Sequence, residues 1–326
     1  MNSLELFKTQ KFYQIDISIL KDLGYDVLLS NRIFDSLLFW KYDILFSYFY
    51  RYSFFAALLA KCFGKKTYFT GGIDSLDSDY ASAFNYKIQA LFFKLCYWVA
   101  DSCIIVSQSD LKNIFKVSSL KKKLSYSEHV INTKLFIADV PKEKIFTSIV
   151  WMGDEGNVVR KGVDKALQIF AELKKIPEFV DYRFVIIGRK GEGEVLVRSI
   201  IDKYNLKGSV ELKGEVSEED KINLLKQSKY YFQLSLYEGF GLAALEALCA
   251  NNIIIHSGKG GLANPIYKEQ LLFDIDNDFD SELLKLVNKL ACFTPITSYD
   301  NLLEYYDIQR RKDDFEAIIV LSLIHI

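Results

Sequence analysis

Residues 230–265 read YYFQLSLYEGFGLAALEALCANNIIIHSGKGGLANP and contain the pattern that decides the fold. The apolar run 230–234 predicts a buried strand, and the glycines of 239–241 predict a turn. Residues 242–250 then have the composition of a buried helix, and 253–256 predict a second strand. A strand, a helix and another strand in succession indicate a parallel β-α-β unit, which binds ligands at the carboxyl ends of its strands.

Two glutamates flank the glycine turn of this segment. Glu238 precedes the turn and Glu246 lies within the helix, so roughly 12 Å along the helix axis separates them. The helix start offers free amides and a partial positive charge, which suit a phosphate group. Because carboxylates accept hydrogen bonds from sugar hydroxyls, the pair is suited to holding opposite ends of one ligand. A simpler interpretation makes Glu246 an exposed helical residue and the glycines plain turn residues.

Basic or glycine-rich loops follow other predicted strands of the second half. They are Arg160-Lys161-Gly162 after the strand 146–152, Gly188–Gly193 after the strand 182–187, and Lys259-Gly260-Gly261 after the strand 253–256. Since the carboxyl ends of parallel strands meet at one edge of a sheet, these loops are predicted to surround a diphosphate. Each loop alone also fits an ordinary solvated turn. Helices are predicted over 162–176, 193–204 and 217–227, the last capped by Ser217.

The first half of the chain shows the same alternation of strands and helices. Strands are predicted over 25–30, 43–48, 66–70 and 102–106, and helices over 11–23, 53–63, 86–100 and 110–115. This alternation predicts a further doubly wound α/β domain. Its first element is a helix, and the strand and glycine-rich loop expected before that helix are not found. The last residues, 317–326, are nearly all apolar and fit either a packed helix or a non-native tail.

Composition narrows the class of protein. The 326 residues suit two domains, and half of them are apolar, as in folded globular proteins. A net charge of −1 argues against a nucleic-acid partner. Residues 1–145 carry 19 Lys/Arg and 14 Asp/Glu, a net of +5, which fits either contact with an anionic membrane surface or ordinary variation.

The five cysteines have no CxxC spacing and predict buried thiols of a reducing cytoplasm rather than disulfides or a zinc site. Neither a leader peptide nor an apolar run of about 18 residues is evident, so we expect a soluble or peripheral protein. Asp77-Ser78-Asp79 has the spelling of a metal-binding motif but is predicted to be a solvated loop.

Residues 100–265 resemble glycosyltransferase family 4, a family of retaining enzymes with the GT-B fold. The segment Glu238-Gly239-Phe240-Gly241-Leu242, followed by Glu246, matches the E-x7-E signature of that family. Arg160-Lys161-Gly162 and the VIIG turn that ends at Gly188 stand in the family's order. His129–Phe136 resembles its interdomain linker. The resemblance is specific because the order of these motifs is kept.

The resemblance implies a role for each residue. Glu238 would bind hydroxyls of the transferred sugar, and Glu246 would bind the ribose of the nucleotide. Lys161, with Arg160, would hold the diphosphate and stabilise it as it departs, without a protein nucleophile or a bound metal ion. The implied catalytic residues are Glu238, Lys161 and Arg160, and the implied donor-binding residues are Gly188, Arg189, Glu238, Gly239, Phe240, Gly241, Leu242 and Glu246.

Several positions depart from the family pattern, and two of these departures bear on the site. Gly153-Asp154 stands where the family often has glycine and arginine, and Arg160 is the nearby substitute. Where many members carry an active-site histidine in the first domain, residues 70–74 read TGGID. The residues expected on the acceptor side are Gly71, Gly72 and Asp74, although Asp74 also fits an ordinary turn.

Together these features predict an α/β protein of the GT-B type, with two Rossmann-like doubly wound parallel-sheet domains facing a cleft. We expect an acceptor-binding domain over 1–143, a nucleotide-sugar domain over 144–298 and a C-terminal helical segment over 299–326. The implied function is transfer of a hexose from a UDP- or GDP-sugar to a glycan or lipid-linked acceptor in surface polysaccharide biosynthesis. The expected location is the cytoplasm, at the inner face of the membrane.

Three alternatives remain open at this point. The chain could be a GT-B sugar-nucleotide epimerase, whose product stays unattached to any acceptor. It could be a non-catalytic relative that only binds nucleotide sugars, which the missing glycine-rich loop favours. A Rossmann dehydrogenase is disfavoured because no GxGxxG motif follows the first strand of either domain.

Overall fold

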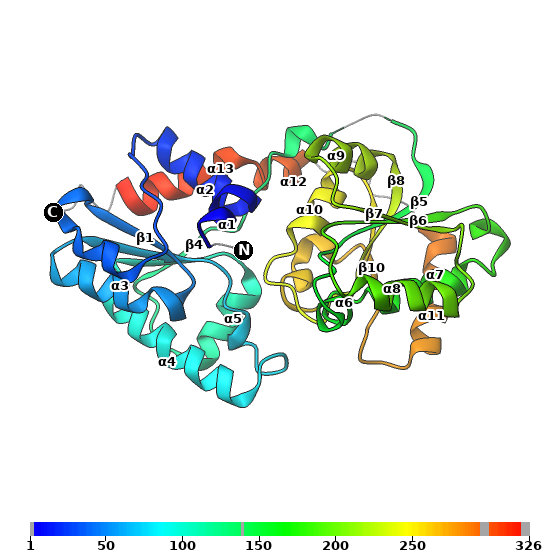
Figure 1. Cartoon of the computed structure of the whole chain (residues 1–326), viewed down its shortest axis with the longest axis horizontal. Coiled ribbons are helices and arrows are strands. Elements are labelled where there is room, and N and C mark those ends of the chain that lie inside the picture. Colours follow the sequence, from blue (N-terminus) through cyan, green and yellow to red (C-terminus); the bar gives the residue numbers. More distant parts are fainter. Residues whose placement is uncertain (1–2, 138–139, 294–299, 321–326) are drawn as a thin grey trace. The chain divides into compact units, whose positions relative to one another are not determined.

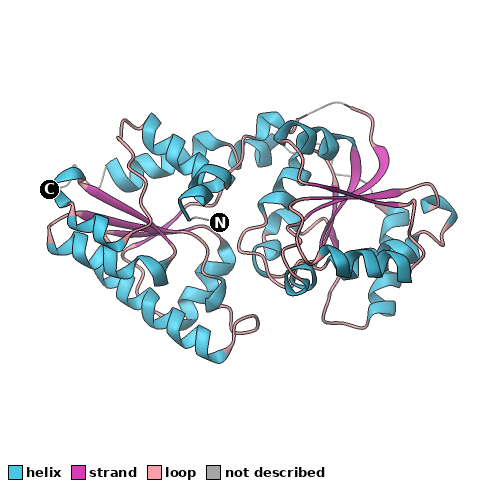
Figure 2. Ribbon diagram, in the orientation of Figure 1, coloured by secondary structure: helices cyan, strands magenta, loops and turns pink. Residues whose placement is uncertain are grey.

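The computed structural model describes residues 3–137, 140–293 and 300–320, and the chain divides into two compact units (Figure 1). Unit 1 comprises Met1–Asn132 and Glu304–Ile326, and unit 2 comprises Thr133–Leu303. Each unit has a parallel sheet of its own, surrounded by helices (Figure 2). The predicted fold class, two α/β domains with parallel sheets, is therefore confirmed.

Unit 1 is built on a four-stranded sheet in the order β1-β2-β3-β4, and every strand pair is parallel. Its strands are β1 (Ile44–Tyr48), β2 (Lys66–Thr70), β3 (Ser102–Ile105) and β4 (Leu124–Tyr126). Its helices are α1 (Ser3–Thr9), α2 (Lys11–Asp22), α3 (Tyr50–Cys62), α4 (Ala83–Val99), α5 (Gln108–Val117) and α13 (Ile308–Phe315).

Successive side chains of β2 point into the two cores of unit 1, as the period of two in a strand requires. Phe69 packs in a cluster formed with α3, α4 and α5. Tyr68 packs in a second cluster with α2 and α13, where it meets Ile19 and Phe315. The sheet is thus covered on both faces, which is the arrangement that a parallel sheet needs.

Unit 2 is built on a six-stranded parallel sheet in the order β10-β9-β8-β5-β6-β7. Its strands are β5 (Glu143–Ile149), β6 (Arg183–Ile187), β7 (Val210–Gly214), β8 (Ser228–Gln233), β9 (Ile253–His256) and β10 (Leu271–Leu272). Its helices are α6 (Glu155–Arg160), α7 (Val163–Leu173), α8 (Glu194–Lys203), α9 (Glu218–Gln227), α10 (Leu242–Cys249) and α11 (Phe279–Cys292), and α12 (Asp300–Tyr305) crosses the boundary between the units.

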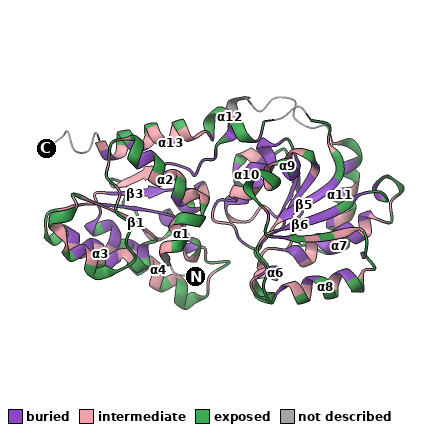
Figure 3. Cartoon of the chain, turned by 45° about the horizontal axis from the view of Figure 1, so that its top comes forward, coloured by how far each residue is buried: buried purple, intermediate pink, exposed green. Residues whose placement is uncertain are grey.

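The main core of unit 2 is aromatic and lies on one face of the sheet. Phe146 of β5 stacks on Tyr230 and Phe232 of β8, with ring centroids 4.6 and 5.1 Å apart. Val185 of β6 points to the opposite face, where it meets Leu224 of α9. Figure 3 shows β5 and β6 as buried strands, so the site loops stand on a rigid support.

The structure corrects some of the predicted elements. Residues 25–30 form no strand, and Leu28 in the middle of them is 67% exposed. An apolar run becomes a strand only when a neighbour pairs with it, and β1 instead pairs with β2. The sequence patterns missed α1, β4, β10, α6 and α11, whereas α12 and α13 lie within the helical segment predicted over 299–326.

The cysteines and the C-terminal residues agree only in part with the predictions. All five cysteines are free thiols, but Cys62 and Cys292 are exposed, so the expectation that all are buried is wrong. Residues Glu316–Val320 form a π-helical turn with Ile319 buried, and the remainder of the predicted apolar end lies outside the described residues. In the described parts of the chain, no helix combines the length and the apolar character needed to cross a bilayer.

Candidate functional site

Four loops of unit 2 meet at one edge of its sheet. They follow β9, β8, β5 and β6, which are consecutive neighbours in the sheet, so their carboxyl ends lie side by side. Two backbone hydrogen bonds tie the loops to one another. Leu236 N–H donates to the Arg160 carbonyl at 2.8 Å, and Gly261 N–H donates to the Glu238 carbonyl at 2.6 Å. The structure therefore brings the predicted loops of residues 160–162, 238–241 and 259–261 together.

Glycines allow this close contact between the loops. Gly162 has φ 68°, and a Cβ there would lie 2.0 Å from the Leu234 carbonyl oxygen. Gly260 has φ 59°, and a Cβ there would lie 2.2 Å from the Glu238 carbonyl oxygen. Both distances are shorter than any tolerable contact, and both dihedrals suit glycine best. The glycines of these loops are thus fixed by backbone packing around Glu238.

Glu238 is held by three donors that all reach one of its oxygens. Its Oε1 accepts hydrogen bonds from Lys161 Nζ at 2.5 Å, from Gln233 Nε2 at 2.8 Å and from Ser235 Oγ at 2.8 Å. No described residue donates a hydrogen bond to Oε2. One oxygen thus orients the carboxylate while the other remains available to a ligand hydroxyl. Gln233 and Ser235 were not predicted, because they lie in an apolar strand segment that carries no motif.

Glu246 is held differently, by an ammonium group from α9. Lys221 Nζ donates to both of its carboxylate oxygens at 2.7 Å, and both side chains are largely buried. Only 6% of Glu246 is exposed, so the interpretation of this residue as an exposed helical glutamate is wrong. Lys221 was missed because it lies in a helix that precedes the signature segment and matches none of its motifs.

A buried tyrosine of β8 extends the hydrogen-bond network around Glu238. Tyr231 O–H donates to Gln233 Oε1 at 3.1 Å, and Gln233 in turn donates to Glu238. Burial raises the pKa of the Tyr231 phenol well above its ordinary value, and the negative charges of Glu246 and Glu238 raise it further. Glu246 lies in α10, which begins directly after the turn that follows Glu238, so the two acids belong to one segment of unit 2.

The glycine turn ends where α10 begins. Gly241 is the residue before the helix and has φ 87°, and its carbonyl accepts the Leu245 N–H at 3.0 Å. Gly239 and Leu242 are partly exposed, whereas Phe240 is 7% exposed. The first amides of α10 and the positive end of its dipole thus begin directly beside Glu238, an arrangement suited to an anion.

The predicted basic residues differ in their surroundings. Arg160 donates to Asn157 Oδ1 at 2.7 Å, and the ammonium of Lys161 contacts Glu238 as described above. Arg189 is exposed and follows Gly188, whose N–H donates to the Gly214 carbonyl at 2.8 Å. All of these cationic groups lie in the segments that follow β5 or β6.

The predicted acceptor-side residues lie in unit 1, after β2. Gly71 has φ 101° and Asp74 begins a short 3₁₀ turn, where it is exposed. The charge of Asp74 acts on Asp110 of α5, which is fully buried. The structure therefore places Gly71, Gly72 and Asp74 beside an acidic group that the sequence did not single out.

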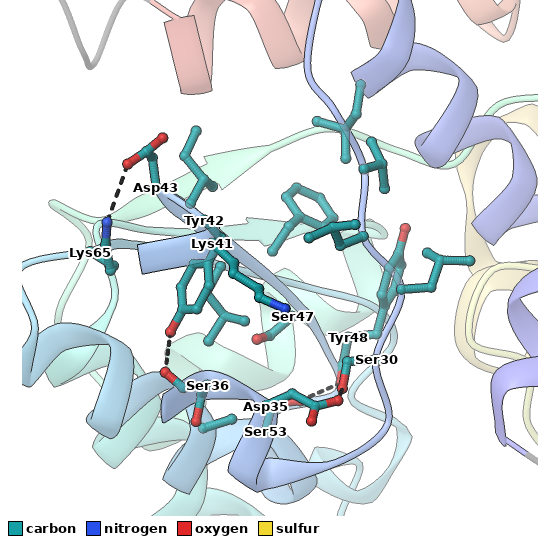
Figure 4. A pocket seen from close by; sticks show the side chains of 18 of the residues that line it. Ser30, Asp35, Ser36, Lys41, Tyr42, Asp43, Ser47, Tyr48, Ser53 and Lys65 are labelled. Atoms are coloured by element: carbon teal, nitrogen blue, oxygen red, sulfur yellow. Dashed lines mark hydrogen bonds and ion pairs between the residues drawn. The ribbon is translucent and has the colours of Figure 1, made fainter. Parts of the chain in front are cut away.

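A cavity of about 1300 Å³ lies elsewhere in unit 1, beside β1 (Figure 4). None of the predicted site residues lines it. Two of its polar side chains bond locally: Tyr42 O–H donates to the Ser36 carbonyl at 2.5 Å, and Lys65 pairs with Asp43 at 3.2 Å. This cavity is therefore not part of the candidate site.

Within the described residues, no group of three or more His, Cys, Asp or Glu side chains is arranged to hold a metal ion. His256, at the end of β9, is buried, and its Nε2 lies 3.2 Å from the Tyr267 carbonyl oxygen. Burial lowers the pKa of His256 to about 4, so this imidazole is neutral at pH 7.

Comparison with known proteins shows what unit 2 is similar to. Residues 156–290 match the family model of the glycosyl transferases group 1. The GDP-mannose:cellobiosyl-diphosphopolyprenol alpha-mannosyltransferase of Xanthomonas oryzae pv. oryzae is 32% identical over 163 residues, which cover 44% of this chain and 40% of that protein. The chain thus spans less than half the length of this relative.

Solved structures share the fold over nearly the whole chain. The trehalose-6-phosphate synthase OtsA has a TM-score of 0.68 at 14% identity, covering 95% of this chain and 82% of OtsA. HepE of Anabaena in complex with UDP-glucose has a TM-score of 0.69 at 12% identity, covering 95% and 89%. The chain therefore has the GT-B fold, and the family match within unit 2, together with the named relative, supports a glycosyltransferase.

Proposed function

We propose that this chain is a retaining glycosyltransferase of family 4 that transfers a hexose from a UDP- or GDP-sugar to a glycan or lipid-linked acceptor. The observation that carries the proposal is the fixed Glu238 carboxylate beside the start of α10, the helix that contains Glu246. The relative named for a GDP-mannose donor and a diphosphopolyprenol acceptor favours a lipid-linked acceptor.

In the proposed mechanism, the nucleotide sugar lies along the carboxyl edge of the unit 2 sheet. Glu238 accepts hydrogen bonds from hydroxyls of the hexose through Oε2, and Glu246 accepts them from the ribose. The diphosphate lies at the start of α10, and Lys161 and Arg160 supply positive charge. The bond from the anomeric carbon to the phosphate oxygen breaks as the acceptor oxygen bonds to that carbon from the same face. The departing diphosphate takes the acceptor's proton, and the fixed cations stabilise its charge.

The proposal includes the cellular setting. Surface polysaccharide biosynthesis in the cytoplasm at the inner face of the membrane suits a lipid-linked acceptor. The basic first half of the chain, with a net charge of +5 over residues 1–145, would favour peripheral contact with anionic lipid. The proposed mechanism requires no metal ion, because the cationic side chains and the start of α10 act on the diphosphate.

The first test is nucleotide binding followed by transfer. A thermal-shift screen against UDP, GDP and ADP identifies the nucleotide that binds, since a ligand of the native state raises the melting temperature. Transfer is then measured with the corresponding radiolabelled nucleotide sugars and lipid-linked glycan acceptors. We expect Glu238→Gln and Lys161→Met each to lower turnover by about a hundredfold or more, as the loss of a group that stabilises developing charge does.

A control variant and the products of the reaction separate this proposal from the alternatives. Lys175→Met, two residues beyond the end of α7, removes a surface pair with Glu172; it is the matched control and should leave turnover unchanged. Full activity of both Glu238→Gln and Lys161→Met would contradict the assignment. Sugar released or rearranged without attachment to an acceptor would indicate the epimerase alternative, and binding without turnover would indicate a non-catalytic relative.

A further inference from the structure

Trp151 follows β5 in the candidate site, and its side chain is 56% exposed. Its carbonyl accepts a hydrogen bond from Asn157 Nδ2, and Asn157 Oδ1 accepts one from Arg160 at 2.7 Å. The next residue, Met152, is buried, and its N–H donates to the Arg189 carbonyl at 2.9 Å. These bonds fix the backbone of Trp151 between the loops that carry Arg160 and Arg189, while its indole contacts solvent.

The strand pattern shows on which side of the sheet the indole lies. The bond from Met152 to Arg189 continues the pairing of β5 with β6 beyond the last residue of β5. Since alternate residues of a strand point to the same face, Trp151 shares a face with Ile149. Ile149 packs in the cluster that contains Leu224 of α9. Trp151 thus lies on the α9 side of the sheet, closer to the carboxyl edge than Ile149.

The same side of the sheet carries the ion pair of Glu246. Lys221, which precedes Leu224 by about one turn of α9, donates to both oxygens of Glu246 at 2.7 Å. Because α9 connects the parallel strands β7 and β8, it runs opposite to them, and it begins near their carboxyl ends. Trp151 and Glu246 therefore lie on one side of the sheet, toward its carboxyl edge.

The indole ring lies over Gly153. A Cβ at residue 153 would lie 2.7 and 2.8 Å from two atoms of the ring, so the ring takes the space that another side chain would fill. Among the residues that the structure describes, no aromatic ring or cation stacks on this indole. Gly153 thus supports one part of the ring, and the exposed part can stack on a planar group of a ligand.

We propose that Trp151 stacks on the base of the nucleotide and thereby strengthens its binding. This inference rests on the proposed function, in which Glu246 binds the ribose. The base is attached directly to that ribose, whereas the diphosphate separates the ribose from the hexose, so the base is the planar group nearest to Glu246. The inference goes beyond the proposed function because it assigns a residue to the base. Every base has a π-face, so stacking on Trp151 suits purines and pyrimidines alike.

Calorimetric titration tests the contribution of the ring. The nucleoside diphosphate that the thermal-shift screen selects is titrated against the whole chain, alongside inorganic pyrophosphate as a probe without a base. We expect Trp151→Ala to weaken binding of the nucleoside diphosphate about tenfold, as the loss of one stacked ring does, and to change pyrophosphate binding less than about twofold. Trp151→Phe, which keeps an aromatic ring, should retain most of the affinity. Trp98→Ala, at an exposed position of unit 1, should retain all of it.

Tryptophan fluorescence observes the contact itself. The chain contains three tryptophans, so a variant with both Trp40→Phe and Trp98→Phe retains only Trp151. The nucleoside diphosphate should quench the emission of this variant, because a stacked base contacts the indole directly. Pyrophosphate should leave the emission unchanged.

The outcomes distinguish this inference from the proposed function. Unchanged affinity of Trp151→Ala for the nucleoside diphosphate, or an equal loss of pyrophosphate binding, would overturn stacking on the base while leaving nucleotide binding by the chain intact. A loss of sugar transfer at unchanged nucleotide affinity would place the ring against the hexose or the acceptor and would overturn it as well. If the unaltered chain binds no nucleotide, the proposed function and this inference fail together.

Discussion

The Glu238 carboxylate illustrates how single residues define this site. Its described hydrogen bonds converge on Oε1, and two of the three donors come from β8 or from the residue two positions beyond it. Backbone contacts from the loop after β9 hold its carbonyl oxygen at the same time. The side chain and the backbone of one residue are thus fixed by separate strands, which restricts the carboxylate to one orientation before a ligand arrives.

Asp110 gives a prediction for the pH dependence of stability. Burial raises the pKa of this carboxyl to about 8, and the charges of Asp74 and Asp77 raise it as well. In the unfolded chain the same group has an ordinary pKa near 3.8. Between these values the folded state holds a proton that the unfolded state has released. The contribution of protonated Asp110 to the stability of the fold is therefore complete below pH 4. It declines as the pH rises to about 8 and is lost above that pH.

Asp110→Asn, which cannot ionise, should therefore flatten this part of the pH profile and stabilise the protein above pH 8. We expect a gain on the order of 1 kcal/mol or more at pH 8.5 relative to the unaltered chain, since one pKa unit corresponds to about 1.4 kcal/mol. Urea denaturation at pH 5 and at pH 8.5 measures it. Asp79→Asn, an exposed acid of the nearby loop, is the control. Identical pH slopes for Asp110→Asn and the unaltered chain would show that Asp110 is not protonated in the fold.

At the scale of elements, α13 is joined to α2 by a buried ion pair. Arg311 donates from Nε and from one terminal nitrogen to the two oxygens of Asp16, at 2.6 and 2.9 Å, and neither side chain is more than 1% exposed. Its other terminal nitrogen donates to the carbonyls of Ser127 and Glu128 at 2.6 and 3.1 Å. Helices at opposite ends of the chain are thus held together beside the sheet of unit 1.

Removal of one partner from this pair should be costly. Arg311→Met leaves the Asp16 carboxylate buried and uncompensated, and we expect a loss of about 3–5 kcal/mol in the free energy of unfolding. Urea denaturation followed by circular dichroism measures the loss. Replacement of both residues by leucine should restore much of it, whereas Lys312→Met should change stability little. If Arg311→Met unfolds at the same urea concentration as the unaltered chain, the pair does not hold α13 in place.

The same elements show what sequence patterns can predict. Ser217 accepts the Asp220 N–H as the cap of α9, and both strands of the segment 230–265 lie where their apolar runs predict them. Local rules suffice there because a cap or a strand in the sheet interior depends on adjacent residues. They fail for residues 25–30, since a strand needs a partner. They also give no sign that α13 packs on α2, because the ion pair between Arg311 and Asp16 joins residues 295 positions apart in sequence.

The candidate site was predictable to a similar extent. Glu238, Glu246 and the glycine loops stand in one motif and in adjacent turns, so their grouping follows from the order of parallel strands. The sequence does not predict that Lys221, Gln233 and Tyr231 belong to the site. Their roles depend on which side chains the fold brings beside the two acids. Positioning groups of this kind are visible only when the chain is folded.

At the scale of the whole molecule, each unit has its own sheet and its own core, and every predicted donor-binding residue lies in unit 2. A nucleotide at the proposed site should therefore stabilise unit 2 first. At a concentration 100 times its dissociation constant, a ligand of the native state contributes about 2.7 kcal/mol. The amides of such a region exchange with solvent through local opening, so this stabilisation slows their exchange.

Hydrogen exchange should accordingly slow most in the segments 160–162 and 238–242 when the nucleotide selected by thermal shift is added. The strands β1 and β2 of unit 1 should change little, because no predicted nucleotide-binding residue lies on them. Mass spectrometry of peptic peptides measures both regions in one experiment, and Glu246→Gln should reduce the protection if this acid holds the ribose. Protection centred on Gly71–Asp74, with unit 2 unchanged, would place the nucleotide in unit 1 and reverse the assignment of donor and acceptor sides.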